Sequence, residues 1–358
     1  MEQTLFKDYV EKYFEPLVLE YNDYINGELK DLHYYHLDFL TPRYSATGEW
    51  ASITTYNQYV KADTIALDAS IPVKRAPSLA QATGKLPKVA TRRQLNETGL
   101  REIQLLEGLG GNQSAEIRRL IFEHVPQVIR GQYEAHEFMF LQALSTGIMT
   151  VNNENNNGTQ FRVDFGYKAE NKGFASVIWG QTGYKPLSDL DALAEKARAK
   201  GSPIRRWLLD RNTFNQIRNS DEAKALFNPL APIVALNLEQ LNMVALDTYG
   251  FIFEIIERVV EIEDKDGNRK TVTPWEAGQV IGISDERLGA LVYSDVAEMS
   301  FPAAQVMYQR AGVNNYMLVK KYRVVEPSLA EVTASESLSL PVLSNVDRIF
   351  KFDSTAVA

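Results

Sequence analysis

The most extensive hydrophobic pattern in the chain lies between Ser114 and Gly147. Ser114 is a favoured residue at a helix N-terminus, and apolar residues then recur at helical spacing as far as Ala143. A single helix through this stretch would be about 50 Å long at about 1.5 Å per residue, far longer than most globular helices. Because Pro126 lies inside the pattern, we expect a kink or a restart there. Polar residues lie mostly on the side of this helix opposite the apolar residues: Arg118, Arg119, Glu123, Gln127, Arg130, Glu134 and Glu137.

The stretch after the long helix predicts an extended strand. It follows an asparagine-rich turn at 152–158, and apolar residues alternate with polar ones between Gln160 and Lys168. Such alternation is typical of a strand with one apolar and one polar face. A very long helix beside an extended sheet favours an elongated, tile-shaped subunit over an enzyme core.

The first 50 residues predict helices that lack a core of their own. Apolar and aromatic residues from Leu5 to Phe14 recur at helical spacing, and this helix is expected to end before Pro16. A second short helix is expected from Leu17 to Ile25. We interpret the region as an arm that finds its partners elsewhere.

Between Ser52 and Ile103 the pattern changes to strands and extended chain. Prolines and glycines interrupt a stretch of basic residues, namely Lys74, Arg75, Lys85, Lys88, Arg92 and Arg93. A loop of this size without a core of its own is uncommon in a compact domain. It therefore either folds back onto the body of the protein or reaches across to another subunit.

Residues 181–317 predict a separate α/β unit. Helices are expected at 187–200, with Ser188 as the cap, and at 211–227 and 237–246. Strands are expected at 206–210, 251–260, 280–283 and 290–293, with a hairpin turn at 264–268. After Met317 the chain is expected to be extended again, with a final strand at 346–352.

Composition narrows the class of protein. The chain has 358 residues, of which 45% are hydrophobic and 23% charged, as in soluble globular proteins with two or more compact units. Its net charge of −8 gives no global basic field that would attract nucleic acid. The absence of cysteine excludes disulfides, thiolate metal sites and cysteine catalysis. With no run of about 18 apolar residues and no signal-peptide pattern, a cytosolic protein without a membrane segment is expected.

No motif indicates catalysis, a cofactor or a metal. The glycines at 108–111 lack the Gly-Lys-Ser/Thr that completes a phosphate-binding loop, and no Gly-x-Ser-x-Gly is present. The residues at 264–268 begin like a calcium loop, but the glycine offset is wrong and the closing glutamate is missing. No carboxylate-flanked pair with ligand spacing occurs among the histidines, which are His33, His36, His124 and His136. We interpret the glycines as a flexible connection before the long helix, residues 264–268 as a hairpin turn, and the histidines as structural or solvent-exposed residues.

Several stretches, each weak alone, become specific through their order and spacing. They are Phe161-Arg162-Val163-Asp164-Phe165-Gly166, Leu187-Ser188-Asp189-Leu190, Trp207-Leu208-Leu209-Asp210, Tyr249-Gly250, Gly278-Gln279-Val280-Ile281 and Ser337-Leu338-Ser339-Leu340-Pro341-Val342. In this order the chain resembles the major capsid proteins of tailed bacteriophages, and most closely the lambda-type protein E family. The resemblance covers roughly residues 50 to 358.

The resemblance implies an α+β, HK97-like major capsid fold with a long spine helix, an extended β-loop and an α/β axial domain. Five parts are implied: an N-terminal arm (1–52), an extended loop (53–107), a peripheral domain with the spine helix and a long strand (108–180), an axial domain (181–317) and a return to the peripheral domain (318–358). Members of the family assemble through hexamers and pentamers into an icosahedral shell around double-stranded DNA.

A non-enzymatic structural subunit with itself as main partner is therefore expected, with no cofactor and no membrane. Portal, scaffold and decoration proteins are further candidate partners, and the DNA would be enclosed without sequence-specific binding. The expected location is the virion, and the host cytoplasm during assembly. The candidate intersubunit residues are Lys74, Arg75, Lys85, Lys88, Arg92 and Arg93. Two alternatives stay open: an encapsulin-like nanocompartment shell protein and a soluble enzyme with its site in the α/β unit.

Overall fold

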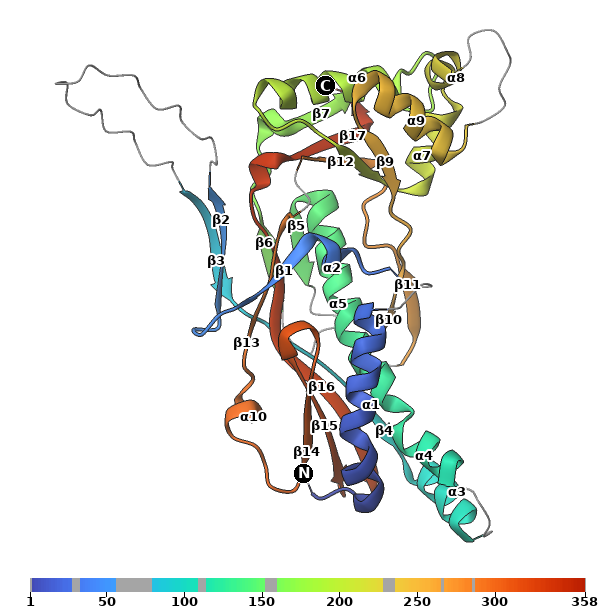
Figure 1. Ribbon diagram of the computed structural model, residues 1–358, viewed down its shortest axis with the longest axis vertical. Helices are drawn as coiled ribbons and strands as arrows, with labels where there is room; N and C mark the ends of the chain where they lie inside the picture. Colours follow the sequence, from blue (N-terminus) through green and yellow to red (C-terminus); the bar gives the residue numbers. More distant parts are fainter. Residues whose placement is uncertain are drawn as a thin grey trace, which may run out of the picture. The chain divides into compact units, whose positions relative to one another are not determined.

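The computed structural model describes residues 2–27, 33–55, 79–108, 114–151, 160–227, 236–264, 267–284 and 287–357. They form two compact units, each assembled from distant parts of the sequence. Unit 1 comprises Met1–Trp50, Gly84–Met139 and Ala290–Val342, and unit 2 comprises Ala51–Thr83, Phe140–Gly289 and Leu343–Ala358. Helices and sheets occur in both units (Figure 1).

Unit 1 is built on a sheet in which six of the described strands take part. Five follow the order β1 (Leu40–Tyr44), β13 (Gly289–Ser294), β16 (Ala330–Leu343), β15 (Met317–Val324) and β14 (Met307–Ala311), and β4 (Lys88–Leu95) also pairs with β16. Both β15 and β4 run antiparallel to β16 along its first half. This half of β16 is therefore a central strand, and its residues are buried. A short helix, α10 (Ala297–Ser300), follows β13.

The N-terminal region is packed within unit 1. A single helix, α1 (Lys7–Gly27), contains Pro16 and contacts β14 (Figure 1). Its buried stripe consists of Val10, Phe14, Val18 and Ile25. The predicted end before Pro16 is wrong because the proline lies on the exposed face, while the continuous apolar stripe holds the turns on both sides of it. The partners of this helix lie elsewhere in the sequence, on β14 of the same chain. A short helix, α2 (Tyr35–Phe39), leads into β1.

The long hydrophobic pattern forms two helices, α4 (Ser114–Phe122) and α5 (His124–Thr146). Pro126 lies in the first turn of α5, where its missing N–H has no partner to lose, so the predicted restart is confirmed. Gly147 follows the helix with a φ of 81°, a left-handed conformation that favours glycine. The extended interpretation of 52–103 is wrong for its last residues, which begin α3 (Glu97–Gly108). Preceding them, β2 (Glu49–Thr55) pairs with β3 (Leu79–Lys85).

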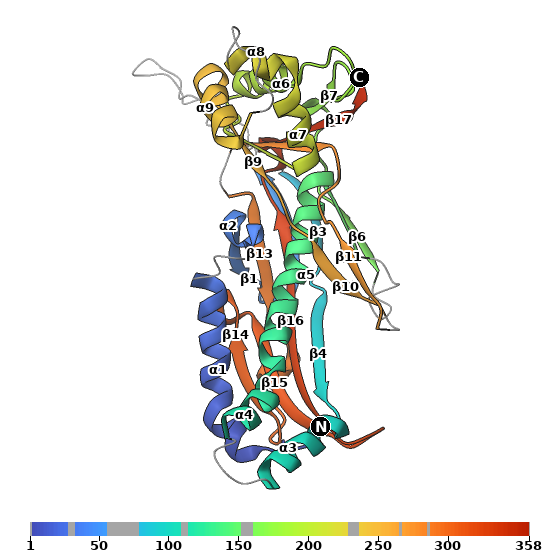
Figure 2. The same cartoon turned by 90° about the vertical axis from the view of Figure 1, so that its right-hand side faces the viewer.

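Unit 2 has a five-stranded sheet with helices packed against an apolar core. Its strand order is β7 (Lys172–Ala175), β17 (Ile349–Val357), β12 (Gln279–Ile283), β8 (Arg206–Leu209) and β9 (Ile252–Ile255). Its helices, drawn from green to orange in Figure 2, are α6 (Pro186–Ala199), α7 (Arg211–Asn219), α8 (Asp221–Phe227) and α9 (Leu238–Tyr249). Trp207 and Phe214 lie in the core. A Cβ atom at position 282 would lie only 2.6 Å from the Trp207 ring, so the close packing there requires glycine.

Two further pairs of strands lie in the described part of unit 2. One is β5 (Ile148–Val151) with β6 (Phe161–Asp164), and the other is β10 (Val260–Glu263) with β11 (Arg269–Val272). The predicted turn at 264–268 is confirmed, since Asp264 Oδ1 accepts from Asn268 N at 2.9 Å and Gly267 has a φ of 84°. The strand predicted at 160–168 is shorter than expected, because the chain turns at Gly166, which has a φ of 69°.

Three other local predictions in unit 2 are wrong. The predicted helix at 211–227 is divided at Ser220, whose Oγ accepts from Ala223 N at 3.2 Å and so caps a new helix, α8. Ser188 does not cap α6, which begins at Pro186. Glu222 performs that role by accepting from the backbone nitrogens of Leu187 and Ser188, at 2.8 and 3.0 Å. The predicted strand at 251–260 is two strands, β9 and β10.

Candidate assembly surfaces

The helix α5 meets β16 through buried polar side chains. We call Gln132, His136, Ser335, Ser337 and Ser339 the serine seam; all five are buried. Alternate residues of a strand face the same side, so the three serines of β16 all point toward α5. Gln132 Nε2 donates to Ser335 O at 3.3 Å, and its Oε1 accepts from Ser337 Oγ at 2.9 Å. These bonds tie one turn of α5 to one position of β16.

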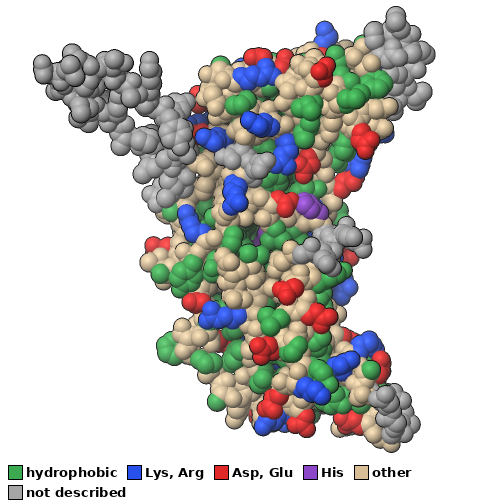
Figure 3. Space-filling model, viewed as in Figure 1, with side chains coloured by type: hydrophobic (Ala, Val, Ile, Leu, Met, Phe, Trp, Pro, Cys, Tyr) green, Lys and Arg blue, Asp and Glu red, His purple; other side chains and the backbone are tan. Residues whose placement is uncertain are grey.

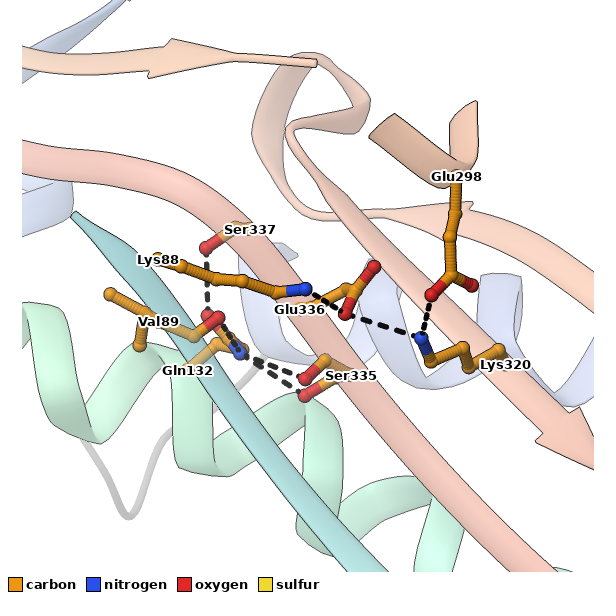
Figure 4. A network of polar contacts seen from close by, with 8 residues as sticks. All are labelled: Lys88, Val89, Gln132, Glu298, Lys320, Ser335, Glu336 and Ser337. Atoms are coloured by element: carbon orange, nitrogen blue, oxygen red, sulfur yellow. Dashed lines mark hydrogen bonds and ion pairs between the residues drawn. The ribbon is translucent and has the colours of Figure 1, made fainter. Parts of the chain in front are cut away.

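Further bonds extend the seam along α5 and onto β4. Ser335 Oγ donates to the backbone oxygen of Val128 at 2.6 Å, and Gln132 Nε2 also donates to Val89 O at 3.1 Å. Figure 4 shows Gln132 between Val89, Ser335 and Ser337. The helix is thus hydrogen-bonded to two neighbouring strands of the sheet.

His136, the residue of the serine seam that lies furthest along α5, has an uncharged imidazole. His136 Nε2 lies 2.7 Å from Ser339 Oγ, which lies 2.7 Å from Ser337 Oγ. Complete burial, together with the nearby His36, lowers the pKa of His136 to about 3. His136 is therefore neutral at ordinary pH, and the seam can form its hydrogen bonds without burying a charge there.

The next residue of α5, Glu137, holds the start of α2. Its two oxygens accept from the backbone nitrogens of Tyr35 and His36, each at 3.0 Å. His36 Nδ1 lies 2.6 Å from Glu137 Oε2, and both side chains are fully buried. A carboxylate at a helix N-terminus is favourable because it accepts hydrogen bonds that the helix itself leaves free. The sequence pattern assigned Glu137 to the polar side of the helix, and the structure buries it.

The first residues of the chain are also fixed to the unit 1 sheet. Glu2 and Arg323 exchange backbone hydrogen bonds of 2.9 and 3.0 Å, and their side chains are paired. Glu331 accepts from the hydroxyl of Thr4 and from the backbone nitrogen of Leu5, the latter at 3.2 Å. The N-terminal residues therefore have a defined position on β15 and β16.

The structure brings together three of the six candidate basic residues. Lys88, Arg92 and Arg93 lie on β4, with Lys88 and Arg92 exposed and Arg93 half-buried. Lys85 is exposed at the end of β3. Lys74 and Arg75 lie outside the residues that the structure describes.

Lys88 is paired within its own unit. On the side of β16 away from the serines, Glu336 Oε2 lies 2.7 Å from Lys88 Nζ and 3.2 Å from Lys320 Nζ, and Lys320 Nζ lies 2.5 Å from Glu298 (Figure 4). Burial opposes the charge of Lys320, but the two carboxylates outweigh it and raise the pKa of Lys320. The network has two positive and two negative groups, so its charges balance.

The described residues contain neither a cluster of three metal ligands nor a membrane-spanning helix. Within the described ranges, no three histidine, aspartate or glutamate side chains are grouped to hold a metal ion. His33 Nε2 lies 2.7 Å from the exposed Asp38, while His36 and His136 belong to the buried contacts above. No helix in that part of the chain combines the length and hydropathy needed to cross a membrane.

A family model described as phage major capsid protein E matches residues 68–354. The chain belongs to the phage major capsid protein E family. The protein is accordingly a structural subunit of a phage capsid shell, and its location is the virion capsid. The predicted resemblance is confirmed, and the nanocompartment and enzyme alternatives receive no support.

Solved structures share the fold at low sequence identity. A protein assigned as the capsid protein of a prophage in E. coli CFT073 is 12% identical, with a TM-score of 0.57 over 95% of this chain and 98% of that chain. A phage-related protein from Bordetella bronchiseptica RB50 is also 12% identical, with a TM-score of 0.52 over 96% of this chain and 97% of that one. They confirm the predicted HK97-like α+β fold. No curated protein matches.

Proposed function

We propose that the protein assembles through hexamers and pentamers into the icosahedral shell that encloses a phage double-stranded DNA genome. The observation that carries the proposal is the match to the capsid family over residues 68–354. The net charge of −8 is compatible with it, because confined DNA needs no basic lining. On the face shown in Figure 3, basic, acidic and apolar side chains are interspersed, as suits many modest contacts with neighbours.

Within this shell, we assign residues 53–107 to an extended loop, and we propose that its part before β4, which pairs with β16 of its own chain, lies over an adjacent subunit. Supporting this, β2 and β3 form a two-stranded sheet, which is marginally stable by itself. Residues 69–96 contain six basic residues and no acidic residue. Lys74, Arg75, Lys85, Lys88, Arg92 and Arg93 are the proposed contacts, with Lys88 shared between this role and Glu336. Residues 181–317 would line the centre of each capsomer, and residues 108–180 and 318–358 would form the peripheral domain. Residues 1–52 would be the N-terminal arm.

Host cytoplasm is the proposed place of assembly, and portal, scaffold and decoration proteins are the proposed further partners. No catalytic role is assigned to any residue.

Electron microscopy of the expressed protein tests the proposal. Closed shells, tubes or capsomers are expected, and a stable monomer under all conditions would contradict it.

The loop assignment is tested by replacing residues 58–76 with two glycines, which leaves β2 and β3 intact. This variant should keep its circular dichroism spectrum and lose closed particles.

The asparagine-rich loop provides a matched control. Replacing residues 153–157 by two glycines also shortens a connection between paired strands, here β5 and β6. This control should still form particles. Shells of normal size from the 58–76 variant would refute the loop assignment while leaving the capsid function intact.

A further inference from the structure

A groove of about 670 Å³ in unit 1 separates α1 from the junction of α4 and α5. Its walls are mainly apolar and aromatic: Leu17, Tyr21 and Tyr24 on α1, and Phe122, Val125 and Pro126 at the junction. Tyr24 is 47% exposed although it is a large aromatic residue. Exposed apolar surface in a concave site is typical of a binding surface, because covering it removes that area from water.

The rim that α1 contributes to this groove is acidic. Glu20 and Asp23 line the groove, and neither forms an ion pair within the described part of the chain. After Lys12, α1 contains no further basic residue. Arg130, one turn after Pro126 on α5, does not line the groove, and its Nε already lies 3.4 Å from Glu134 Oε1. An occupant of the groove should therefore be apolar and carry positive charge.

A segment of the proposed extended loop has this composition. Residues 71–75 read Ile-Pro-Val-Lys-Arg, three apolar residues followed by two basic ones. They lie inside the stretch 69–96, which carries no acidic residue. Resting on the proposed shell assembly, we propose that residues 71–75 of a neighbouring copy dock in the groove, with Ile71 and Val73 against the aromatic walls and Lys74 and Arg75 beside Glu20 and Asp23.

The connection to β3 limits which copy can supply the segment. Ile71 lies eight residues before Leu79, where β3 begins, and this separation spans at most about 28 Å. A copy more distant than an immediate neighbour is therefore excluded. Each copy offers one segment and one groove, so the contact is heterologous, and such contacts generate closed rings when the rotation between neighbours closes.

A disulfide trap tests the contact directly, because the chain has no cysteine of its own. Particles of the Tyr24→Cys, Val73→Cys variant are oxidised and run on a non-reducing gel. We expect a ladder of covalent multimers. The matched control is Leu105→Cys with Val73→Cys, since Leu105 is 69% exposed on α3 and does not line the groove; it should give no ladder.

The outcomes of the trap separate this inference from the proposed function. Intact particles without a bridge would overturn the docking site and leave the shell assembly standing. A bridge confined to monomers would show that the segment occupies the groove of its own chain, and would also overturn the proposal. If the unmodified protein forms no particles, the proposed function fails and this contact fails with it.

Charge reversal gives a second, independent readout. Glu20→Lys with Asp23→Lys should lower the particle yield at least tenfold while circular dichroism stays unchanged, and Lys74→Glu with Arg75→Glu should do the same. Combining all four substitutions should restore most of the yield, because opposite charges again face each other. A fourfold variant no better than either double variant would refute the pairing. A loss caused only by the groove substitutions would mean that a different partner occupies it.

Discussion

The two units hold their helices against their sheets in different ways. In unit 2 the contact is apolar: Leu187, Leu190, Trp207, Phe214, Phe251 and Phe253 belong to one buried cluster. In unit 1, α5 is joined to β16 and β4 by an amide, an imidazole and three hydroxyls. Glu137 adds a buried carboxylate on the same helix. One helix–sheet contact is thus non-directional, while the other depends on specific donors and acceptors.

The two kinds of contact differ more in how firmly they fix the position of the helix on the sheet than in how much they stabilise the unit. Apolar burial is roughly proportional to area, so small shifts of a helix cost little until volume is lost. A hydrogen-bonded seam is less tolerant, because a shift of α5 by one turn would leave Gln132 and three serines buried without partners. Each unmet buried group costs about 1–3 kcal/mol. Unit 1 should therefore be sensitive to lost hydrogen bonds and unit 2 to lost volume.

The largest effect is expected in the unit 2 core. Trp207→Ala should lower the free energy of unfolding by about 3–5 kcal/mol, because it leaves a large cavity beside Gly282. Trp207→Phe is the matched control and should cost clearly less, since the buried Trp207 Nε1 has no hydrogen-bond partner to lose among the described residues. Urea denaturation with hydrogen exchange resolved along unit 2 measures both. Equal losses would mean that the indole nitrogen, and not volume, is what matters.

A smaller but still large effect is expected in unit 1 from Glu137→Gln. The change removes the charge opposite His36 and leaves one oxygen to accept from two backbone nitrogens, at a cost of about 3 kcal/mol. Amide exchange in α2 and α5 should rise. Gln127→Ala, on the exposed face of the same helix, is the control and should change little. If both variants behave alike, the buried carboxylate does not anchor α2.

Acid should weaken the seam through His136. The pKa of His136 is about 3 in the folded protein against an ordinary 6.5, so between these values the unfolded chain binds more protons and stability falls as pH falls. The contribution lost by pH 4 is about 3 kcal/mol at about 1.4 kcal/mol per pH unit. His136→Gln removes this term, so the advantage of the wild type over the variant should shrink from pH 7 to pH 4. A constant difference across that range would exclude His136 as the titrating group.

The same contrast explains how much of the fold the sequence could predict. Unit 2 elements such as β8, α9 and the turn before β11 lie within a few residues of their predicted positions, because apolar periodicity and turn residues mark them locally. The prediction of two helices over α1 is wrong because its apolar stripe continues past Pro16 and holds the helix together on both sides.

The seam could not be predicted by the same means. Gln132 and Glu137 are polar, and a pattern analysis places polar residues at the surface. Their partners lie up to 205 residues away in the sequence. A usable signal was the repeat of serines at 335, 337 and 339, since hydroxyls at alternate positions of a strand indicate a polar neighbour on one face. The intersubunit role of the basic residues of β4 stays a prediction, and nothing local to Lys88 reveals its partner Glu336.

The smallest effect is expected from Lys88→Ala. Lys88 is 53% exposed, and Glu336 keeps Lys320 at 3.2 Å after the change, so the free energy of unfolding should fall by less than about 1 kcal/mol. Lys320→Met, the matched control, removes the cation shared by Glu298 and Glu336 and should cost clearly more, since both carboxylates are largely buried. Urea denaturation of the two variants measures this order, and the reverse order would contradict the network drawn here. If Lys88→Ala nevertheless lowers the particle yield strongly, the charge of Lys88 acts between subunits, because its contribution within the subunit is too small to explain the loss.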